Sequence, residues 1–339
     1  MTKFLVLLAK VLTGLSLASV CYAATTDELM QIVSAHVVKV QVALTNGGYG
    51  LGSGVVVAKD QVVTNCHVIA NAATVSIRAN GENYSVSALK PDWHHDLCIL
   101  KVADLKMPVA RIGTCERLRY EQKVYTVGFA NTSPRPNGAI GYIKGVYPMD
   151  DSVIVRASNT FKLGDSGGGM FDEAGQLVGI ITVKSPGHNA FYYHMPVEWV
   201  QRLLDTPEQS LASKSELPFW AEAQDRWPYF MRVVHPLKTE NWHELHRIAL
   251  EWFEKEPSNT EALFYRAVAE YSLKDRMNAE THFNQVIAQN SKNSSAFYYL
   301  GLIAEENGKR IEALNMIALL NSLDETTAGE LKVAIGVQD

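Results

Sequence analysis

The chain has 339 residues, a length that suits two domains and their connections better than one small domain. Hydrophobic residues make up 47% and charged residues 20% of the sequence, which indicates a globular chain with a core and excludes global disorder. The net charge is -5, from 31 Lys and Arg against 36 Asp and Glu, so the chain lacks the basic surface that nucleic-acid binding requires.

Residues 1–23 have the pattern of a secretory signal peptide. Lys3 and Lys10 supply a basic start, and an apolar run that is too short to span a bilayer follows. Small residues at Cys21 and Ala23 stand where a signal peptidase reads, so we expect cleavage after Ala23. Lipid attachment at Cys21 is the weaker alternative, because a bulky residue precedes it. We therefore expect an exported protein, in a bacterial periplasm or secreted, that has no membrane association after cleavage.

The sequence between residues 35 and 196 predicts many short strands. In the first of them, Val38, Val40 and Val42 alternate with residues of the opposite face. Further apolar runs are separated by turn sequences rich in Gly, Asn and Pro; these runs lie at 55–57, 75–78, 84–88, 97–102, 124–128, 139–146, 153–155, 177–182 and 191–195. Short strands at close spacing indicate a sandwich or barrels.

A helix with an apolar face that includes Trp199 and Leu203 ends this region, and residues 206–227 are predicted to be a Pro- and Ser-bearing linker. The hydrophobic period then becomes helical, and the sequence repeats every 34 residues: 262–265 matches 296–299. This period resembles the tetratricopeptide repeat, in which helix pairs stack with small residues where they touch. The resemblance implies an all-α repeat domain.

We assign that helical domain to residues 228–335. Its resemblance implies a concave groove for a peptide or a protein partner. Residues 24–205 carry 16 acidic and 16 basic side chains, whereas residues 206–339 carry 20 and 13, so we expect the groove to favour neutral or basic ligands. The alternative is that the helices cap the first domain or mediate self-association. The linker should let the two modules fold independently, with an interface between them left open.

Three polar segments, Thr-Asn-Cys-His-Val, His-Asp-Leu-Cys and Gly-Asp-Ser-Gly-Gly-Gly, supply His67, Asp96 and Ser166 in that order. A serine hydroxyl is a weak nucleophile and needs a base to take its proton. An imidazole has the right basicity near neutral pH, and a buried carboxylate can hold its tautomer. The backbone N–H groups of Gly164 and Ser166 can converge on an oxyanion if the loop turns tightly, which glycine permits.

These segments, together with the run Gly52-Ser53-Gly54, resemble the chymotrypsin/trypsin-like serine proteases of the compact HtrA-like branch. The resemblance implies that residues 24–205 form an all-β double six-stranded barrel with the active site between the barrels. It also implies peptide-bond hydrolysis through an acyl-enzyme, with His67 as base, Asp96 as its orienting acid and Ser166 as nucleophile.

Other site residues follow from the same resemblance. Asp165 stands where HtrA-like enzymes usually have asparagine, and in trypsin-like enzymes a freed N-terminus pairs with that carboxylate; its partner here is left open. The base of the substrate pocket is expected near Thr160, with Lys184 and Phe191 on its walls. We therefore expect a preference for small or medium aliphatic side chains, with Lys184 recruiting an acidic side chain as the alternative.

The sequence predicts neither a cofactor nor a metal site. His94 and His95 are adjacent, and adjacent residues of a strand point to opposite faces, so they are not expected to bind one ion. Cys66, Cys98 and Cys115 remain after cleavage, so at least one thiol is free or pairs between chains. Cys66 and Cys98 are expected to lie near each other, and we favour buried free thiols over a disulfide.

The predicted function is an exported serine endopeptidase that acts on polypeptides, with a helical-repeat module for partner or substrate recruitment. A catalytically silent scaffold whose repeats mediate protein interaction is the main alternative, and a hydrolase of small esters is a third. The complete set of His67, Asp96 and Ser166 favours the enzyme.

Overall fold

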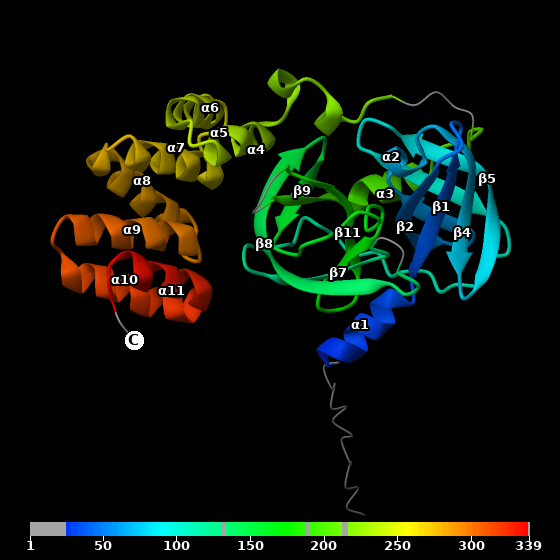
Figure 1. The fold of residues 1–339 in the computed structure, drawn as a ribbon, viewed down its shortest axis with the longest axis horizontal. Helices are drawn as coiled ribbons and strands as arrows, with labels where there is room; N and C mark the ends of the chain where they lie inside the picture. The colour runs from blue at the N-terminus through cyan, green and yellow to red at the C-terminus, as the bar shows by residue number, and fades with distance from the viewer. Residues whose placement is uncertain (1–24, 131–132, 187–189, 212–215, 338–339) are drawn as a thin grey trace, which may run out of the picture.

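The structure, a computed structural model, describes residues 25–130, 133–186, 190–211 and 216–337. The predicted signal peptide lies outside the described residues, as does part of the predicted linker. Two β-barrels stand side by side, and an arc of helices lies against the second barrel (Figure 1). Within the described ranges, every helix is too short or too polar to cross a membrane.

The first barrel is a closed antiparallel sheet in the strand order β1-β2-β3-β6-β5-β4. Its strands are β1 (Val37–Leu44), β2 (Tyr49–Ala58), β3 (Gln61–Thr64), β4 (Ala72–Ala79), β5 (Glu82–Asp92) and β6 (Leu97–Val102). Val38, Val40 and Val42 are buried in its core, as their alternation predicts. Such β-branched side chains pack well on a pleated sheet that is buried on one face.

The second barrel repeats this architecture in the order β10-β11-β12-β9-β8-β7. Its strands are β7 (Lys123–Gly128), β8 (Asn137–Met149), β9 (Ser152–Ala157), β10 (Gly169–Phe171), β11 (Leu177–Lys184) and β12 (Tyr192–Pro196). Helix α3 (Val197–Leu204) follows and buries Trp199 and Leu203 on the face that the sequence predicts. The fold class predicted for residues 24–205, two six-stranded barrels, is confirmed.

A helix that the sequence analysis does not include, α1 (Thr26–Ser34), precedes the first strand. Thr25 caps it: the Thr25 side chain accepts from the backbone N–H of Glu28, and the Glu28 carboxylate accepts from the backbone N–H of Thr25. Leu29 and Val33, one turn apart, are buried beside Gly175 of the second barrel. The missed signal was therefore this capping box followed by an i, i+4 apolar pair.

The helical region begins with two short 3-10 turns and continues as paired helices. Its elements are η1 (Phe219–Ala221), η2 (Gln224–Arg226), α4 (Tyr229–Arg232), α5 (Val234–Lys238), α6 (Trp242–Lys255), α7 (Thr260–Ser272), α8 (Arg276–Gln289), α9 (Ser294–Glu306), α10 (Arg310–Leu323) and α11 (Glu325–Ala334). Helices α7 and α9 begin 34 residues apart, as do α8 and α10. The sequence period is thus the period of the helix pairs.

Small residues lie where these helices touch. Ala279 and Ala313, one period apart, are fully buried. A Cβ on Gly301 would lie 2.5 Å from a methyl carbon of Leu331, so α9 and α11 approach closely only because residue 301 is a glycine. The predicted helical class of this region is confirmed.

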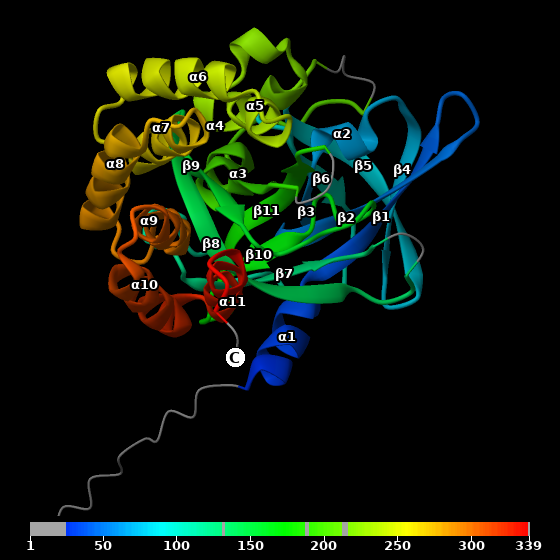
Figure 2. The ribbon, with the colours of Figure 1, turned by 60° about the vertical axis from the view of Figure 1, so that its left-hand side comes forward.

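The helical region packs against the second barrel, as the two views of the ribbon agree (Figures 1 and 2). Phe230 stacks on Tyr147 with ring centroids 4.2 Å apart, and the Tyr193 hydroxyl donates to the Phe230 carbonyl. Arg156 and Glu261 form an ion pair at 2.7 Å, and Tyr147 also donates to Glu261. One hydrophobic cluster runs from the barrel into the helices. The interface that the sequence analysis leaves open is therefore present.

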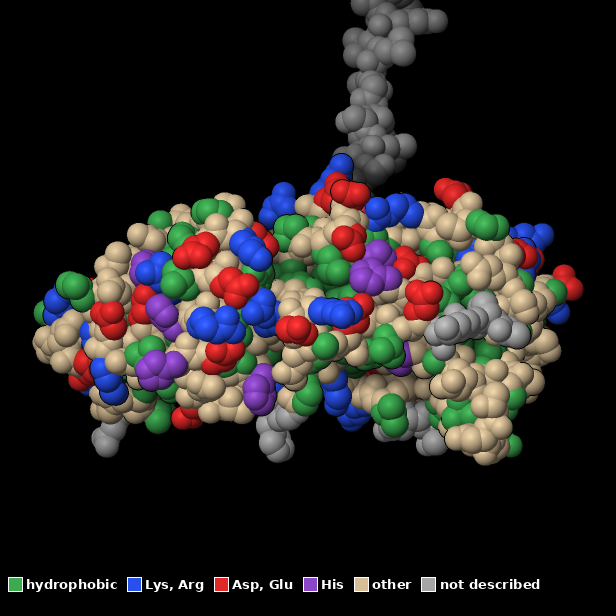
Figure 3. All heavy atoms as spheres, turned by 90° about the horizontal axis from the view of Figure 1, so that it is seen from above, with side chains coloured by type: hydrophobic (Ala, Val, Ile, Leu, Met, Phe, Trp, Pro, Cys, Tyr) green, Lys and Arg blue, Asp and Glu red, His purple; other side chains and the backbone are tan. Residues whose placement is uncertain are grey.

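On the face that Figure 3 shows, the acidic side chains of residues 206–339 do not form one continuous negatively charged patch. Acidic and basic side chains are interspersed there, over the helices and over the barrels (Figure 3). Several of the acids are paired, including Glu251 with Arg232 and Glu306 with Arg276. On this face, electrostatic attraction of a basic partner therefore depends on local sites rather than on one extended field.

Buried His194 makes the fold sensitive to acid. Burial lowers the pKa of His194 to about 4, so the folded protein keeps it neutral while the unfolded chain takes up a proton near pH 6.5. The contribution of neutral His194 to the free energy of unfolding is complete above pH 6.5 and is lost as the pH falls toward 4. Between pH 7 and 4.5, wild type should lose about 2 kcal/mol more unfolding free energy than His194→Gln, as measured by urea denaturation. Equal losses would contradict this prediction.

Candidate active site

His67 and Asp96 are joined by two hydrogen bonds. His67 lies in the short helix α2 (Cys66–Ile69) after β3, and Asp96 lies in the turn between β5 and β6. His67 Nδ1 lies 2.6 Å from Asp96 Oδ2, and the His67 backbone N–H donates to Asp96 Oδ1 at 2.8 Å. Asp96 is fully buried, whereas 32% of the His67 side chain is exposed. A carboxylate at Nδ1 favours the tautomer in which Nε2 can accept a proton.

The turn that carries Asp96 is fixed from both barrels. Asp96 has a φ of 59°, in the left-handed region that aspartate tolerates better than most residues. Its carbonyl accepts from Asn65 Nδ2 at 2.9 Å and from the backbone N–H of Cys66. Asn65 Nδ2 also donates to Thr182 Oγ1 on β11 of the second barrel. The carboxylate is therefore oriented by backbone and side-chain contacts that do not involve His67.

The loop of Ser166 is attached to β2 of the first barrel. The Ser53 backbone N–H donates to the Ser166 carbonyl at 2.8 Å, and Ser53 Oγ donates to the Gly164 carbonyl at 2.8 Å. Gly167 has a φ of 86°, and a Cβ there would lie 2.1 Å from the Ser53 carbonyl oxygen. A Cβ on Gly52 would lie 2.5 Å from Val68. The Gly-Ser-Gly run of β2 thus lets the serine loop approach the helix that carries His67.

Two backbone donors in this loop, those of Gly164 and Ser166, are the ones predicted for the oxyanion site. Gly164 has a φ of 99°, which a residue with a side chain rarely adopts. Among the described residues, the backbone N–H groups of Gly164 and Ser166 donate to no carbonyl of the protein. They flank Asp165, whose own N–H donates to the Lys162 carbonyl. The loop therefore has two N–H groups available for an anionic oxygen.

Asp165 has one oxygen in use and one without a partner in the described part of the chain. Oδ2 accepts from the Lys162 backbone N–H at 2.7 Å, whereas Oδ1 is buried and unbonded. Burial raises the pKa of Asp165, although the bond from Lys162 opposes this effect. A Cβ on Gly128 would lie 2.8 Å from Oδ1, so glycine makes room for the carboxylate. The partner of Asp165, which the sequence analysis leaves open, is therefore the Lys162 backbone N–H for one of its two oxygens.

The three residues predicted for the substrate pocket do not line one hollow. Thr160 is exposed and lines a hollow of about 460 Å³ that also includes Gly128 and Asp165. Phe191 lines a different hollow of about 330 Å³ and packs beside the Arg156 guanidinium, with 4.5 Å from Cζ to the ring centroid. Lys184 is exposed at the end of β11. The structure thus does not bring Thr160, Lys184 and Phe191 together around one pocket.

Cys66 and Cys98 form a disulfide, so the preference for free thiols is wrong for this pair. Strand β3 ends at Thr64, two residues before Cys66, and its pairing with β6 sets Thr64 opposite Cys98. The two cysteine Cα atoms lie 5.0 Å apart. Cys115 is buried and free. Burial raises the pKa of its thiol, which disfavours the reactive thiolate.

His94 and His95 lie in a turn rather than on a strand, so the argument that they point to opposite faces is wrong. Their ring centroids are 4.9 Å apart. His95 Nδ1 lies 2.7 Å from Asp92 Oδ2. Both histidines therefore point to one side of the turn that carries Asp96.

Trp220, a residue that the sequence analysis does not single out, contacts His67. The two rings meet edge to face at a centroid distance of 5.5 Å. Trp220 comes from the predicted linker, where the buried Phe219 donates its backbone N–H to the His94 carbonyl. The indole Nε1 is buried and has no partner among the described residues. No local motif marks this contact, because it depends on how the linker returns to the first barrel.

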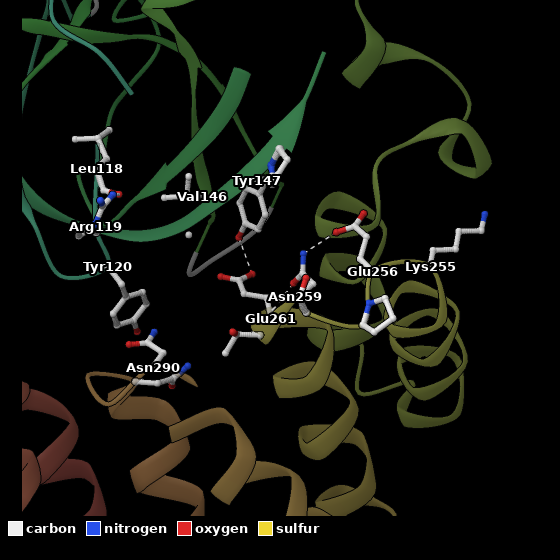
Figure 4. Close-up of a pocket in the computed structure, with 16 residues that line it drawn as sticks. Leu118, Arg119, Tyr120, Val146, Tyr147, Lys255, Glu256, Asn259, Glu261 and Asn290 are labelled. Carbon is white, nitrogen blue, oxygen red and sulfur yellow. Dashed lines mark hydrogen bonds between the residues drawn. The ribbon is translucent and has the colours of Figure 1, made fainter. Parts of the chain in front are cut away.

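A cavity of about 680 Å³ lies between the second barrel and the helices (Figure 4). Tyr147 and Glu261 point toward each other across it and are hydrogen-bonded, and Asn259 bonds to Glu256 on the helical side (Figure 4). Its walls include Arg119 and amide side chains such as Asn259, groups that can hydrogen-bond a peptide backbone.

Two closed barrels, with a His–Asp pair in one and a Gly-Asp-Ser-Gly loop in the other, define a chymotrypsin-like peptidase domain. Residues 52–180 match the trypsin-like peptidase domain family. The resemblance to trypsin-like and HtrA-like proteases is thereby confirmed for this part of the chain.

Curated relatives agree with that assignment. The probable periplasmic serine endoprotease DegP-like of Pseudomonas fluorescens is 28% identical over 156 residues, which cover 44% of this chain and 33% of that protein. Serine protease HTRA1 of Xenopus laevis is 28% identical over 148 residues, which cover 39% and 31%. The chain thus spans about a third of the length of these relatives. A solved protease from M. tuberculosis has 19% identity and a TM-score of 0.49, and covers 56% of this chain and 86% of that chain.

Proposed function

We propose that this protein is a serine endopeptidase in which Ser166 is the nucleophile, His67 the general base and Asp96 the acid that orients the imidazole. The observation that carries the proposal is the 2.6 Å contact between His67 Nδ1 and the buried Asp96 carboxylate. A buried carboxylate is costly unless it is well paired. Here its partner is the imidazole of His67, which remains partly exposed. Helix α2, which carries this imidazole, contacts β2, and β2 also holds the serine loop.

The proposed reaction forms and hydrolyses an acyl-enzyme. His67 Nε2 takes the Ser166 hydroxyl proton as Oγ attacks the substrate carbonyl carbon. The N–H groups of Gly164 and Ser166 stabilise the resulting oxyanion. The imidazolium then gives its proton to the leaving amine, and a water molecule, activated by His67 in the same way, releases the acyl group. Asp96 stays ionised and stabilises the imidazolium.

An active-site-directed organophosphonate tests this proposal directly, because only an activated serine reacts with it. Labelling of the folded protein at Ser166 is the expected result. A folded protein that resists the reagent would support the catalytically silent scaffold. Turnover of small esters without cleavage of an unfolded protein such as casein would support the esterase alternative.

For specificity we keep the proposal of small or medium aliphatic side chains before the cleaved bond. It now rests on Thr160 alone, which the resemblance places at the base of the pocket, since Lys184 and Phe191 do not line the hollow of Thr160. The acid that does line this hollow, Asp165, is buried and has one oxygen bonded to the Lys162 backbone N–H. Sequencing the products of casein digestion measures this preference. Strong cleavage after Arg or Lys would contradict it.

We further propose that the protein is exported, because of its N-terminal sequence and the periplasmic designation of its relatives.

We also propose that the helical region recruits a protein substrate or partner. The cavity of Figure 4 supports recruitment, because Arg119 and asparagine side chains that can exchange hydrogen bonds with a peptide line it. Truncation after Asp205 tests this role, but it also uncovers Tyr147 and Tyr193. The truncation also removes Trp220, which contacts His67. A fall in short-peptide turnover well beyond that of Trp220→Ala, in a folded truncated chain, would therefore show that the helices support the active site instead.

Trp220 should contribute to turnover through its contact with His67. Edge-to-face aromatic pairs contribute about 0.5–1.5 kcal/mol, so Trp220→Ala should lower kcat/KM for a short peptide by roughly 2–10-fold. Trp227→Ala is the matched control, because that indole lies in the same linker and donates to the Glu222 carbonyl rather than touching His67. Equal effects of the two substitutions would contradict a specific role for Trp220.

A further inference from the structure

His94, His95 and Asp150 present three metal-ligating atoms to one point beside the two barrels. His95 Nε2 lies 3.0 Å from Asp150 Oδ2, and His94 Nε2 lies 3.8 Å from the same oxygen. All three atoms lie within 4.8 Å of one another. Both histidines come from the β5–β6 turn, and Asp150 comes from the β8–β9 turn, so the cluster spans the first and second barrels.

These separations suit a zinc ion. Zinc binds histidine nitrogen and carboxylate oxygen at about 2.0–2.2 Å in tetrahedral geometry, which sets neighbouring ligand atoms roughly 3.3–3.5 Å apart. The two measured separations, 3.0 and 3.8 Å, lie on either side of that range. Shifts of a few tenths of an ångström in the exposed His94 ring and in the exposed Asp150 carboxylate would bring both separations into that range. Three protein ligands leave a fourth position for water.

The ring of His95 is oriented by groups outside the three ligands. Asp92 Oδ2 lies 2.7 Å from His95 Nδ1, and Asp92 Oδ1 accepts from the His95 backbone N–H. The ring also lies against Trp199, at a centroid distance of 3.8 Å. A carboxylate on the far nitrogen of a metal-binding histidine fixes its tautomer and raises its basicity. His95 thus has the second partner that histidine ligands usually have.

Asp150 is likewise held in position. Its carbonyl accepts from the indole N–H of Trp199 at 3.1 Å and from the guanidinium of Arg202 at 3.0 Å. Asp150 has a φ of 45°, which directs the chain through the tight β8–β9 turn. Trp199 therefore contacts the His95 ring and the Asp150 backbone, and keeps the two sides of the cluster in register.

We propose that His94, His95 and Asp150 bind one divalent cation of borderline softness, with Zn²⁺ as the best fit. Imidazole nitrogen suits Zn²⁺, Cu²⁺ and Ni²⁺, whereas Ca²⁺ and Mg²⁺ prefer sites made of oxygen ligands. The bound cation would cross-link the β5–β6 turn to the β8–β9 turn. Since His95 directly precedes Asp96, this link would stabilise the turn that orients the carboxylate. The proposal does not depend on the proposed enzymatic activity.

A metal-free arrangement of the same groups is the competing explanation. Burial alone would lower the pKa of His95, but its bonds to Asp92 and Asp150 raise it instead. A protonated His95 could then bridge the two carboxylates without any ion. That arrangement needs no contribution from His94, which makes His94 the residue that distinguishes the two explanations.

Zinc titration of the chelator-treated full-length protein tests the proposal. Calorimetry with ZnCl₂ should show one bound ion, and zinc should raise Tm, whereas CaCl₂ should leave Tm unchanged. His94→Ala should weaken zinc binding at least tenfold and leave the Tm of the metal-free protein unchanged, because the His94 ring is exposed. His243→Ala, which removes an exposed histidine of α6, is the matched control and should bind zinc like wild type.

Three results would overturn the proposal. These are no saturable zinc binding by the wild-type protein, equal zinc affinity of wild type and His94→Ala, and a response to calcium as large as that to zinc. Asp150→Asn adds a second check: it should also lose zinc binding, while circular dichroism reports whether the variant has folded.

Discussion

Replacing Ser166 by alanine is expected to lower kcat by about six orders of magnitude and to abolish organophosphonate labelling. In the proposed mechanism the Ser166 Oγ forms the acyl bond, so nothing in the variant can replace that step. The variant should still fold, because the contacts of this loop use the Ser166 carbonyl and the carbonyl of Gly164, which the substitution leaves intact.

Ser85→Ala serves as the control for this experiment, since Ser85 is an exposed serine on β5 of the first barrel. It should be labelled at the wild-type rate. Labelling that persists in Ser166→Ala would show that another serine is the nucleophile, and the proposed function would have to be rebuilt around that residue.

The barrels and the grouping of His67 with Asp96 follow from features that are local in the sequence. Alternation of Val38, Val40 and Val42 reports one buried face, and turn residues mark where each strand ends. His67 and Asp96 stand next to strand ends, so antiparallel pairing of β3 with β6 is enough to bring them together. The chain order of the motifs therefore carries most of the information about this pair.

The disulfide between Cys66 and Cys98 is a feature that the chain order of the motifs does not predict. Cys66 directly precedes His67 and Cys98 follows Asp96 by two residues, so the two cysteines are expected near each other, but bond formation also needs a Cα separation of about 4.4–6.8 Å. That separation depends on the register between β3 and β6, which sets Thr64 opposite Cys98. A shift of two residues in that register would separate the sulfurs, which is why the sequence-based preference for free thiols could be wrong.

Trp220 and the contact between barrel and helices were beyond sequence reasoning for a different reason. Both join segments that are far apart in the chain: Trp220 meets His67, and Arg156 meets Glu261. Helical periodicity reports that α7 has a buried face but not which surface covers it. The same limit applies to His94 and His95, whose turn conformation, rather than a strand, brings their rings to one side.

Replacing Asp96 by asparagine is expected to lower kcat/KM by about four orders of magnitude with little change in the fold. Asparagine can keep the bond from the His67 backbone N–H, which the Oδ1 position accepts at 2.8 Å. Its amide NH₂ then faces His67 Nδ1 at the position where the carboxylate now lies 2.6 Å away. An NH₂ group donates, so Nδ1 must become the acceptor and Nε2 must carry the proton. An imidazole protonated at Nε2 cannot take the proton of Ser166 Oγ.

Asp60→Asn is a matched control for this substitution. Asp60 has a φ of 60° and Asp96 a φ of 59°, and the Asp60 carboxylate likewise accepts a backbone N–H, that of Leu105, but it contacts no histidine. Both variants therefore exchange the same atoms at the same backbone conformation, and only one changes the partner of an imidazole. Short-peptide kinetics should show kcat/KM near wild type for Asp60→Asn and a loss of about 10⁴ for Asp96→Asn. A folded Asp96→Asn protein with near-normal turnover would mean that His67 does not act as the base.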